Sequence, residues 1–97
     1  MAKADPSIIP PGKSQAFIYT GEQIPNQVMV ANMDRTNDAA FRLTSGDRAW
    51  TYFGSIHPGD AVSLMVEWPS GRATFFNDSG NGVNINVYGL GIFPAES

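Results

Sequence analysis

The stretch HPGDAVSLMVEWPSGRATFFNDSGNGVNINVY, residues 57–88, decides the fold. Its three apolar runs, residues 61–68, 73–76 and 83–88, are separated by clusters of Pro, Gly, Asn, Asp and Ser, as is typical of antiparallel strands joined by turns. Alternate side chains of a strand point to opposite faces. The apolar sets that share one face, and that we expect to point into a core, are Val62, Leu64, Val66 and Trp68 in the first run and Val83, Ile85 and Val87 in the last.

The rest of the chain continues this pattern on both sides. Further strands are expected at residues 8–9, 14–20, 27–33, 39–44 and 49–56, and residues 90–93 either extend the last strand or pack back on the core. About seven or eight short strands spaced by roughly 8–12 residues, without a helical period, predict an all-β chain folded as an antiparallel two-sheet β-sandwich. A partly closed small β-barrel is the alternative.

Two strands carry more detailed expectations. Residues 27–33, QVMVANM, are almost continuously apolar, which predicts a central strand that is covered on both faces. Gly54 lies inside the run 49–56, and a glycine inside a strand indicates a bulge.

The length of 97 residues predicts one domain, with residues 1–7 as an N-terminal tail and residues 8–97 as a single sandwich. The proline-broken start MAKADPSIIPPGK lacks the apolar core of a signal peptide. No apolar run approaches the length of a transmembrane helix, so we expect a soluble chain, and its compartment stays open.

The composition narrows the class of partner. Six basic and nine acidic residues give a formal charge of −3, and the arginines are scattered singly, whereas nucleic acids and anionic membranes require a clustered basic face. Only 15% of the residues are charged, which favours a surface covered by partners, and self-association in particular. There is no cysteine, so disulfides, thiolate metal sites and a cysteine nucleophile are excluded.

Exposed aromatic and amide side chains indicate a ligand surface. Flat aromatic rings stack on the C–H faces of sugars, and the same side chains dominate protein interfaces. Tyr88 shares a strand face with Asn84 and Asn86, and Trp50 and Tyr52 share a face of another strand; we expect Trp68 in the core and leave Trp50 open. The candidate ligand-binding residues are Tyr88, Asn84, Asn86, Asn81, Asp78, Trp50 and Tyr52.

The segment Asn77-Asp78-Ser79-Gly80, followed by an alternating Val-Asn-Ile-Asn strand, resembles the closing hairpin of some small bacterial lectins of β-sandwich type. The resemblance covers residues 77–86 only, and the wider pattern of calcium ligands in those lectins is not found in this chain. What the resemblance implies is sugar binding.

Two loops that contain acidic residues, residues 34–38 and 77–82, offer an alternative chemistry, and we call them the acidic loops. Calcium takes six to eight oxygen ligands, and if both loops lie at one end of the sandwich, they bring together Asp34, Asn37, Asp38 and Asp78. The same residue types form ordinary β-turns for steric reasons. We therefore expect no cofactor and keep calcium as the alternative.

No catalytic set is apparent. His57 is the only histidine, it lies in a turn, and it has no nucleophile and acid at a spacing that forms a triad. The sequence therefore predicts a non-enzymatic binding module, a small homo-oligomeric, lectin-like β-sandwich that binds carbohydrate. The alternative is a structural or interaction subunit of a larger assembly, such as a virion or an appendage, without a small-molecule ligand.

Overall fold

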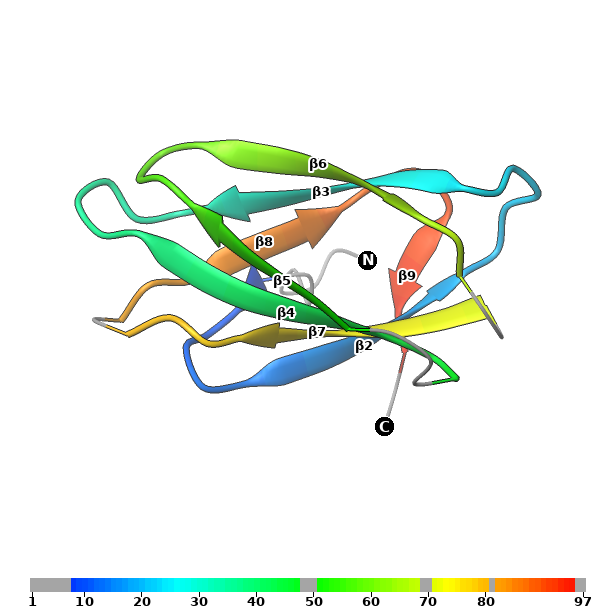
Figure 1. The fold of residues 1–97 in the computed structure, drawn as a ribbon, viewed down its shortest axis with the longest axis horizontal. Coiled ribbons are helices and arrows are strands. Elements are labelled where there is room, and N and C mark those ends of the chain that lie inside the picture. Colours follow the sequence, from blue (N-terminus) through cyan, green and yellow to red (C-terminus); the bar gives the residue numbers. More distant parts are fainter. Residues whose placement is uncertain (1–7, 48–50, 69–70, 81, 96–97) are drawn as a thin grey trace, which may run out of the picture.

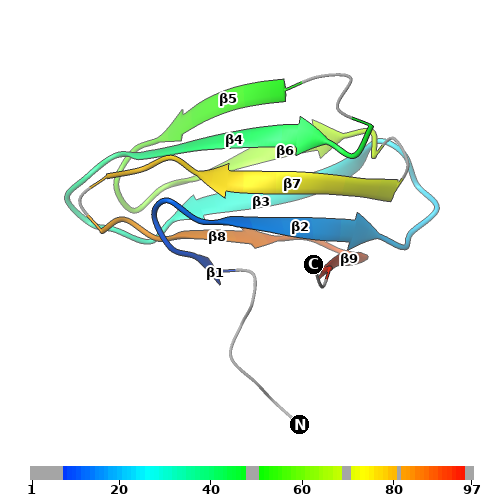
Figure 2. The same ribbon diagram turned by 90° about the horizontal axis from the view of Figure 1, so that it is seen from below.

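The computed structural model describes residues 8–47, 51–68, 71–80 and 82–95. In these residues the chain forms two antiparallel sheets that face each other and do not close into a barrel (Figures 1 and 2). The four-stranded sheet has the order β1 (Ile8–Ile9), β8 (Ile85–Tyr88), β3 (Asn26–Asn32), β6 (Ala61–Val66). The five-stranded sheet has the order β5 (Thr51–Ile56), β4 (Ala39–Ser45), β7 (Arg72–Asn77), β2 (Ser14–Tyr19), β9 (Ile92–Pro94). The predicted β-sandwich is confirmed.

The core lies between the two sheets and is built from alternate residues of every strand. Phe75 of β7 is fully buried at its centre, with the ring of Phe17 edge-on at 5.6 Å and the ring of Phe41 stacked at 6.5 Å. The predicted facing is confirmed, because Val66, Trp68, Val83, Ile85 and Val87 are all buried. Val62 and Leu64 also face inward and pack on this core, but they are only half buried since β6 is an edge strand.

Residues 92–94 neither extend β8 nor lie in the same sheet. They form β9, which pairs with β2 in the five-stranded sheet, and Ile92 reaches the core from there. The short β9 therefore adds one strand to the predicted number.

The prediction that residues 27–33 are covered on both faces is wrong for the described chain. In β3, Val28 and Val30 are buried, whereas Met29 and Ala31 on the opposite face are half exposed and Met33 is 49% exposed. The apolar residues on its outer face give this strand the composition of one that is buried on both faces, but no other layer of the described residues packs there.

The bulge predicted at Gly54 is absent from the described strand. The pairing between β4 and β5 runs without an extra residue, and Gly54 lies directly opposite Phe41. A β-carbon at residue 54 would lie 2.6 Å from the ring atoms of Phe41. Residue 54 is thus glycine because the phenylalanine ring occupies the space of a side chain.

Candidate functional site

The strand residues on the outer face of the four-stranded sheet carry no charge. They alternate with the buried ones and include an exposed tyrosine, two methionines and several amides or small side chains. Neighbouring strands set Tyr88 opposite Met29, and Met29 opposite Ser63. The described strand residues on this face, none of them charged, are Ile8, Asn86, Tyr88, Gln27, Met29, Ala31, Ala61, Ser63 and Met65.

A hollow of about 550 Å³ opens at one end of this face. Its apolar lining comes mainly from Met29, Met65 and Leu90, and amide side chains stand around them. Met65 is 63% exposed and Leu90 is 88% exposed, so both can contact a ligand. The lining residues are Gln23, Pro25, Asn26, Gln27, Met29, Met65, Gly89 and Leu90.

Hydrogen bonds orient two of the amides. The side-chain N–H of Gln27 donates to Oγ of Ser63 at 2.7 Å, across the pairing of β3 with β6. The side-chain N–H of Asn26 donates to the carbonyl of Leu90 at 3.3 Å and ties the segment after β8 to the start of β3. The surface therefore combines apolar side chains with positioned amides and hydroxyls.

The candidate ligand-binding residues from the sequence separate into three places. Tyr88 and Asn86 lie together on the outer face of the four-stranded sheet, and exposed Asn84 precedes them on the same side of the chain. Tyr52 stands at the edge of the sandwich, and Asp78 turns toward the outer face of the five-stranded sheet. Trp50 and Asn81 lie outside the described residues.

Asp78 is held away from Tyr88 by an ion pair. Its carboxylate accepts hydrogen bonds from Nε of Arg42 at 2.7 Å and from an Nη of Arg42 at 3.2 Å. The guanidinium also lies 4.3 Å from the centre of the Phe76 ring. The hydrogen bond to Asp78 raises the pKa of Arg42 above its ordinary value.

The two acidic loops do lie at one end of the sandwich, where the N–H of Met33 donates to the carbonyl of Asn84 at 3.0 Å. One carboxylate oxygen of Asp34 already accepts four hydrogen bonds from Thr36 and Asn37. The backbone N–H groups of Thr36 and Asn37 lower the pKa of Asp34.

The two remaining carboxylates are turned to other partners. Asp38 lies 3.7 Å from Nδ1 of the exposed His57, and Asp78 pairs with Arg42. Among the described residues, no three acidic or histidine side chains are grouped as a metal site requires.

Two buried asparagines, each at the end of a strand, form hydrogen bonds to the loop that follows. The sequence interpretation did not identify these roles. It placed Asn77 in a loop, but Asn77 is the last residue of β7 and is 1% exposed. Its side-chain amide donates to the carbonyls of Ile9 and Val83 at 2.8 and 2.9 Å, and its Oδ1 accepts the N–H of Ser79 at 2.9 Å.

Asn32 makes the same arrangement at the end of β3. Its amide donates to the carbonyls of Asn37 and Ile56, and its Oδ1 accepts the N–H of Asp34. The alternation of strand residues was the available signal in the sequence, because Asn32 lies on the same face of β3 as the buried Val28 and Val30.

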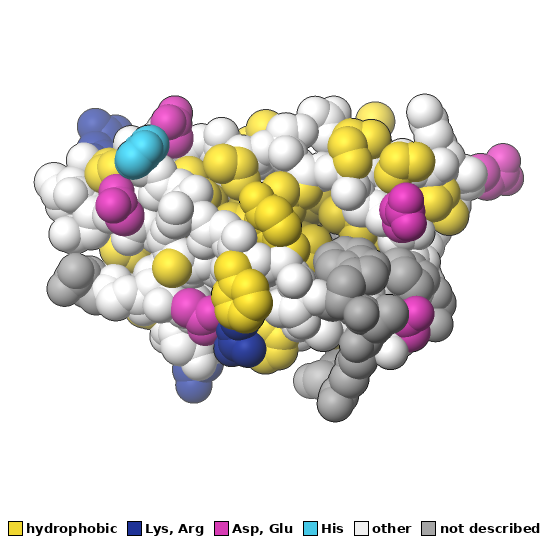
Figure 3. Space-filling view, viewed as in Figure 1, with side chains coloured by type: hydrophobic (Ala, Val, Ile, Leu, Met, Phe, Trp, Pro, Cys, Tyr) yellow, Lys and Arg dark blue, Asp and Glu magenta, His cyan; other side chains and the backbone are white. Residues whose placement is uncertain are grey.

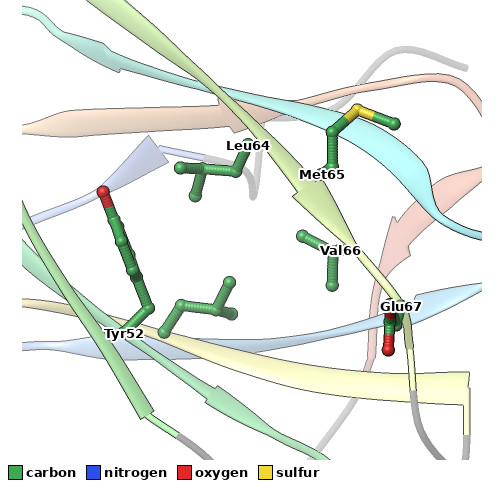
Figure 4. A pocket seen from close by; sticks show the side chains of 6 residues that line it. Tyr52, Leu64, Met65, Val66 and Glu67 are labelled. Atoms are coloured by element: carbon green, nitrogen blue, oxygen red, sulfur yellow. The ribbon is translucent and has the colours of Figure 1, made fainter.

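A second hollow, of about 280 Å³, opens between the edge strands β5 and β6. Figure 3 shows apolar side chains gathered in the hollow between the sheets on this edge. Tyr52 of β5 points across the opening, Leu64 and Val66 of β6 point into it, and Met65 points away (Figure 4). We call this opening the edge groove; it is lined by Leu43, Tyr52, Leu64, Met65, Val66 and Glu67.

Comparisons with known proteins do not identify this chain. No protein-family model, no curated protein sequence and no solved structure matches it. No helix in the described ranges has the length and apolar character needed to cross a bilayer.

Proposed function

We propose that this protein is a non-enzymatic binding module and that the outer face of its four-stranded sheet binds a neutral carbohydrate. The observation that carries the proposal is the exposed ring of Tyr88 on a strand face whose described residues include amides and methionines but no charged group. A face without charge does not attract nucleic acid, phosphate or acidic peptides by electrostatics.

The chemistry of the face suits a sugar. A pyranose ring presents an apolar C–H face and a rim of hydroxyls. Tyr88 and Met29 are cross-strand neighbours and form an apolar strip for the C–H face, because an aromatic ring offers a large rigid contact surface. Gln27 and Ser63 lie one step away on the same face and supply donors and acceptors for hydroxyls.

The runner-up function is that of a subunit in a larger assembly. The observation that favours it is the edge groove, where two six-residue edge strands leave apolar side chains exposed. Edge strands of this kind are a template for pairing with another chain. The two functions are compatible, because weak sugar sites gain avidity when several copies are joined.

The test is an array of immobilised neutral and acidic glycans, probed with the whole chain with and without calcium. We expect binding to at least one neutral glycan in both conditions. Replacing Tyr88 by Ala should weaken that binding about tenfold or more, since a central aromatic contact is typically worth more than 1 kcal/mol.

The matched control is Phe93→Ala. Phe93 is 53% exposed and therefore tolerant of replacement, but it lies in β9 of the five-stranded sheet, away from the proposed binding face. Equal loss of binding in the Tyr88 variant and the control variant, or binding to no glycan at all, would contradict the proposal. Binding that requires calcium would shift attention to the acidic loops.

A further inference from the structure

The two open edges of the sandwich differ in the length and composition of their strands. One edge is formed by β1 and β9, which have two and three residues; Pro10 follows β1, and Pro94 is the last residue of β9. The other edge is formed by β5 and β6, each with six residues and neither with a charge or a proline. Natural sheets protect exposed edges by short strands, prolines, lysines or inward-pointing charges. The first edge follows that rule and the second does not.

The unprotected edge is also rich in exposed aromatic surface. Phe53 is 70% exposed on the outer side of β5, and Tyr52 is 47% exposed at the mouth of the edge groove (Figure 4). Among the described strands only β4 pairs with β5. In an antiparallel edge strand about half of the backbone N–H and C=O groups point away from the sheet, so β5 presents hydrogen-bonding groups as well as rings.

We propose that β5 pairs in an antiparallel manner with β5 of a second copy of this chain, about a two-fold axis perpendicular to the sheet. A second copy fits because the strand TYFGSI has no charge, so that self-pairing brings no like charges together. The strand equally lacks any charged group that would select a different chain by complementarity. The pairing joins the two five-stranded sheets into one.

The two-fold axis restricts the register. The axis is perpendicular to the sheet, so the outer faces of both copies lie on the same side. An outward-facing residue can therefore lie opposite only an outward-facing residue of the second copy, and an inward-facing residue only opposite an inward-facing one. The register that centres on the strand sets Phe53 opposite Phe53 of the second copy, Tyr52 opposite Gly54, and Thr51 opposite Ser55. It joins the most exposed aromatic residue of the strand to its copy on the outer face. On the inner face it lays a tyrosine beside a residue without a side chain.

The area of the proposed contact is small. An aromatic side chain can bury about 150–250 Å², so the exposed parts of Phe53 and Tyr52 contribute roughly 250 Å² from each copy. A standard stable interface buries about 800 Å² per partner. The rim of the edge groove, including Leu64, adds to this area. We therefore expect a dimer that dissociates on dilution.

This dimer is independent of the proposed sugar site. It leaves the outer face of the four-stranded sheet uncovered in both copies. The dimer therefore has two such faces, which would raise avidity for a repeating ligand. Failure of the dimer would not affect the binding of a soluble monosaccharide, and failure of sugar binding would not affect the dimer.

The register is tested by disulfide cross-linking, which the cysteine-free chain allows without a background of native thiols. In the whole-chain variant Phe53→Cys, the two thiols face each other across the axis, where opposed β-carbons are about 4.5–5.5 Å apart. Mild oxidation should convert most of this variant into a covalent dimer. Phe93→Cys is the control, since Phe93 is 53% exposed on the same sheet but at its protected edge; equal cross-linking of both variants, or of neither, would overturn the proposal.

The dimer itself is tested by sedimentation of the wild-type chain over a wide concentration range. We expect a monomer–dimer equilibrium, a shift to monomer in Phe53→Lys, and a dimer that persists in Phe93→Lys. Ser55→Lys, at an exposed residue of the same strand, serves as a second variant if Phe53→Lys unfolds. A wild-type chain that stays monomeric throughout, an open-ended series of larger species, or a dimer that survives in the β5 variants would overturn the proposal.

Discussion

The replacement of Asn77 by Ala tests how the loop end of the sandwich is held. Asn77 is 1% exposed, and its side chain makes three hydrogen bonds of 2.8–2.9 Å, one to β1 and two to the loop that follows β7. Each buried hydrogen bond contributes about 1 kcal/mol net, and groups left unpaired in the interior add to the loss. We expect the variant to lose about 3 kcal/mol of unfolding free energy, out of a total of about 5–15 kcal/mol for a domain of this size.

The assay is equilibrium urea unfolding followed by tryptophan fluorescence. With a slope of about 1–3 kcal/mol per molar, the midpoint should fall by roughly 1–3 M. Asn84→Ala is the control, because Asn84 is exposed and its truncation should change stability by no more than about 0.5 kcal/mol. A loss below about 1 kcal/mol for Asn77→Ala, or equal losses for both variants, would refute the reasoning.

Three further predictions concern single residues. Val66→Asp should unfold the protein, since a buried unpaired charge costs several kcal/mol. Met65→Asp, at the neighbouring exposed position, should remain folded when both variants are measured by circular dichroism. Unchanged stability of Val66→Asp would mean that the strand faces are misassigned. Gly54→Ala should cost about 1–3 kcal/mol, because the new β-carbon would lie 2.6 Å from the ring of Phe41, and a neutral effect in thermal unfolding would contradict that packing. Asp34→Asn should lower the melting temperature at pH 7, because the pKa of Asp34 is depressed below its ordinary value of 3.8 by hydrogen bonds from its own loop. A depressed carboxyl pKa stabilises the fold above that ordinary value, and this advantage is lost as the pH falls through the folded pKa. The variant and the wild type should therefore converge in acid, and a difference that persists below the folded pKa would contradict this explanation.

The fold class could be predicted from the sequence because burial in a sandwich follows a period of two. The series Val83, Ile85 and Val87 alternates with polar residues, and all three are buried. Such a pattern tells which side of a strand faces the core. It does not tell which strands are neighbours, and therefore could not predict that β5 and β6 lie at an edge.

The same limit explains what the sequence interpretation missed at the candidate site. Asp78 and Arg42 are 36 residues apart in the chain, so their ion pair depends on the pairing of β4 with β7. The apolar outer face of β3 has the composition of a buried surface, and composition alone could not distinguish a covered face from an exposed binding surface. Gly54 has the local signature of a bulge, whereas its cause is a ring from the neighbouring strand.

The most direct test of the proposed binding surface is a map of backbone amide shifts by NMR. The whole chain would be titrated with the best neutral glycan of the array, and separately with calcium. The account predicts that the glycan shifts amides around Tyr88, Met29 and Ser63 on the neutral sheet face, with or without calcium. Shifts confined to the acidic loops, residues 34–38 and 77–82, would contradict it.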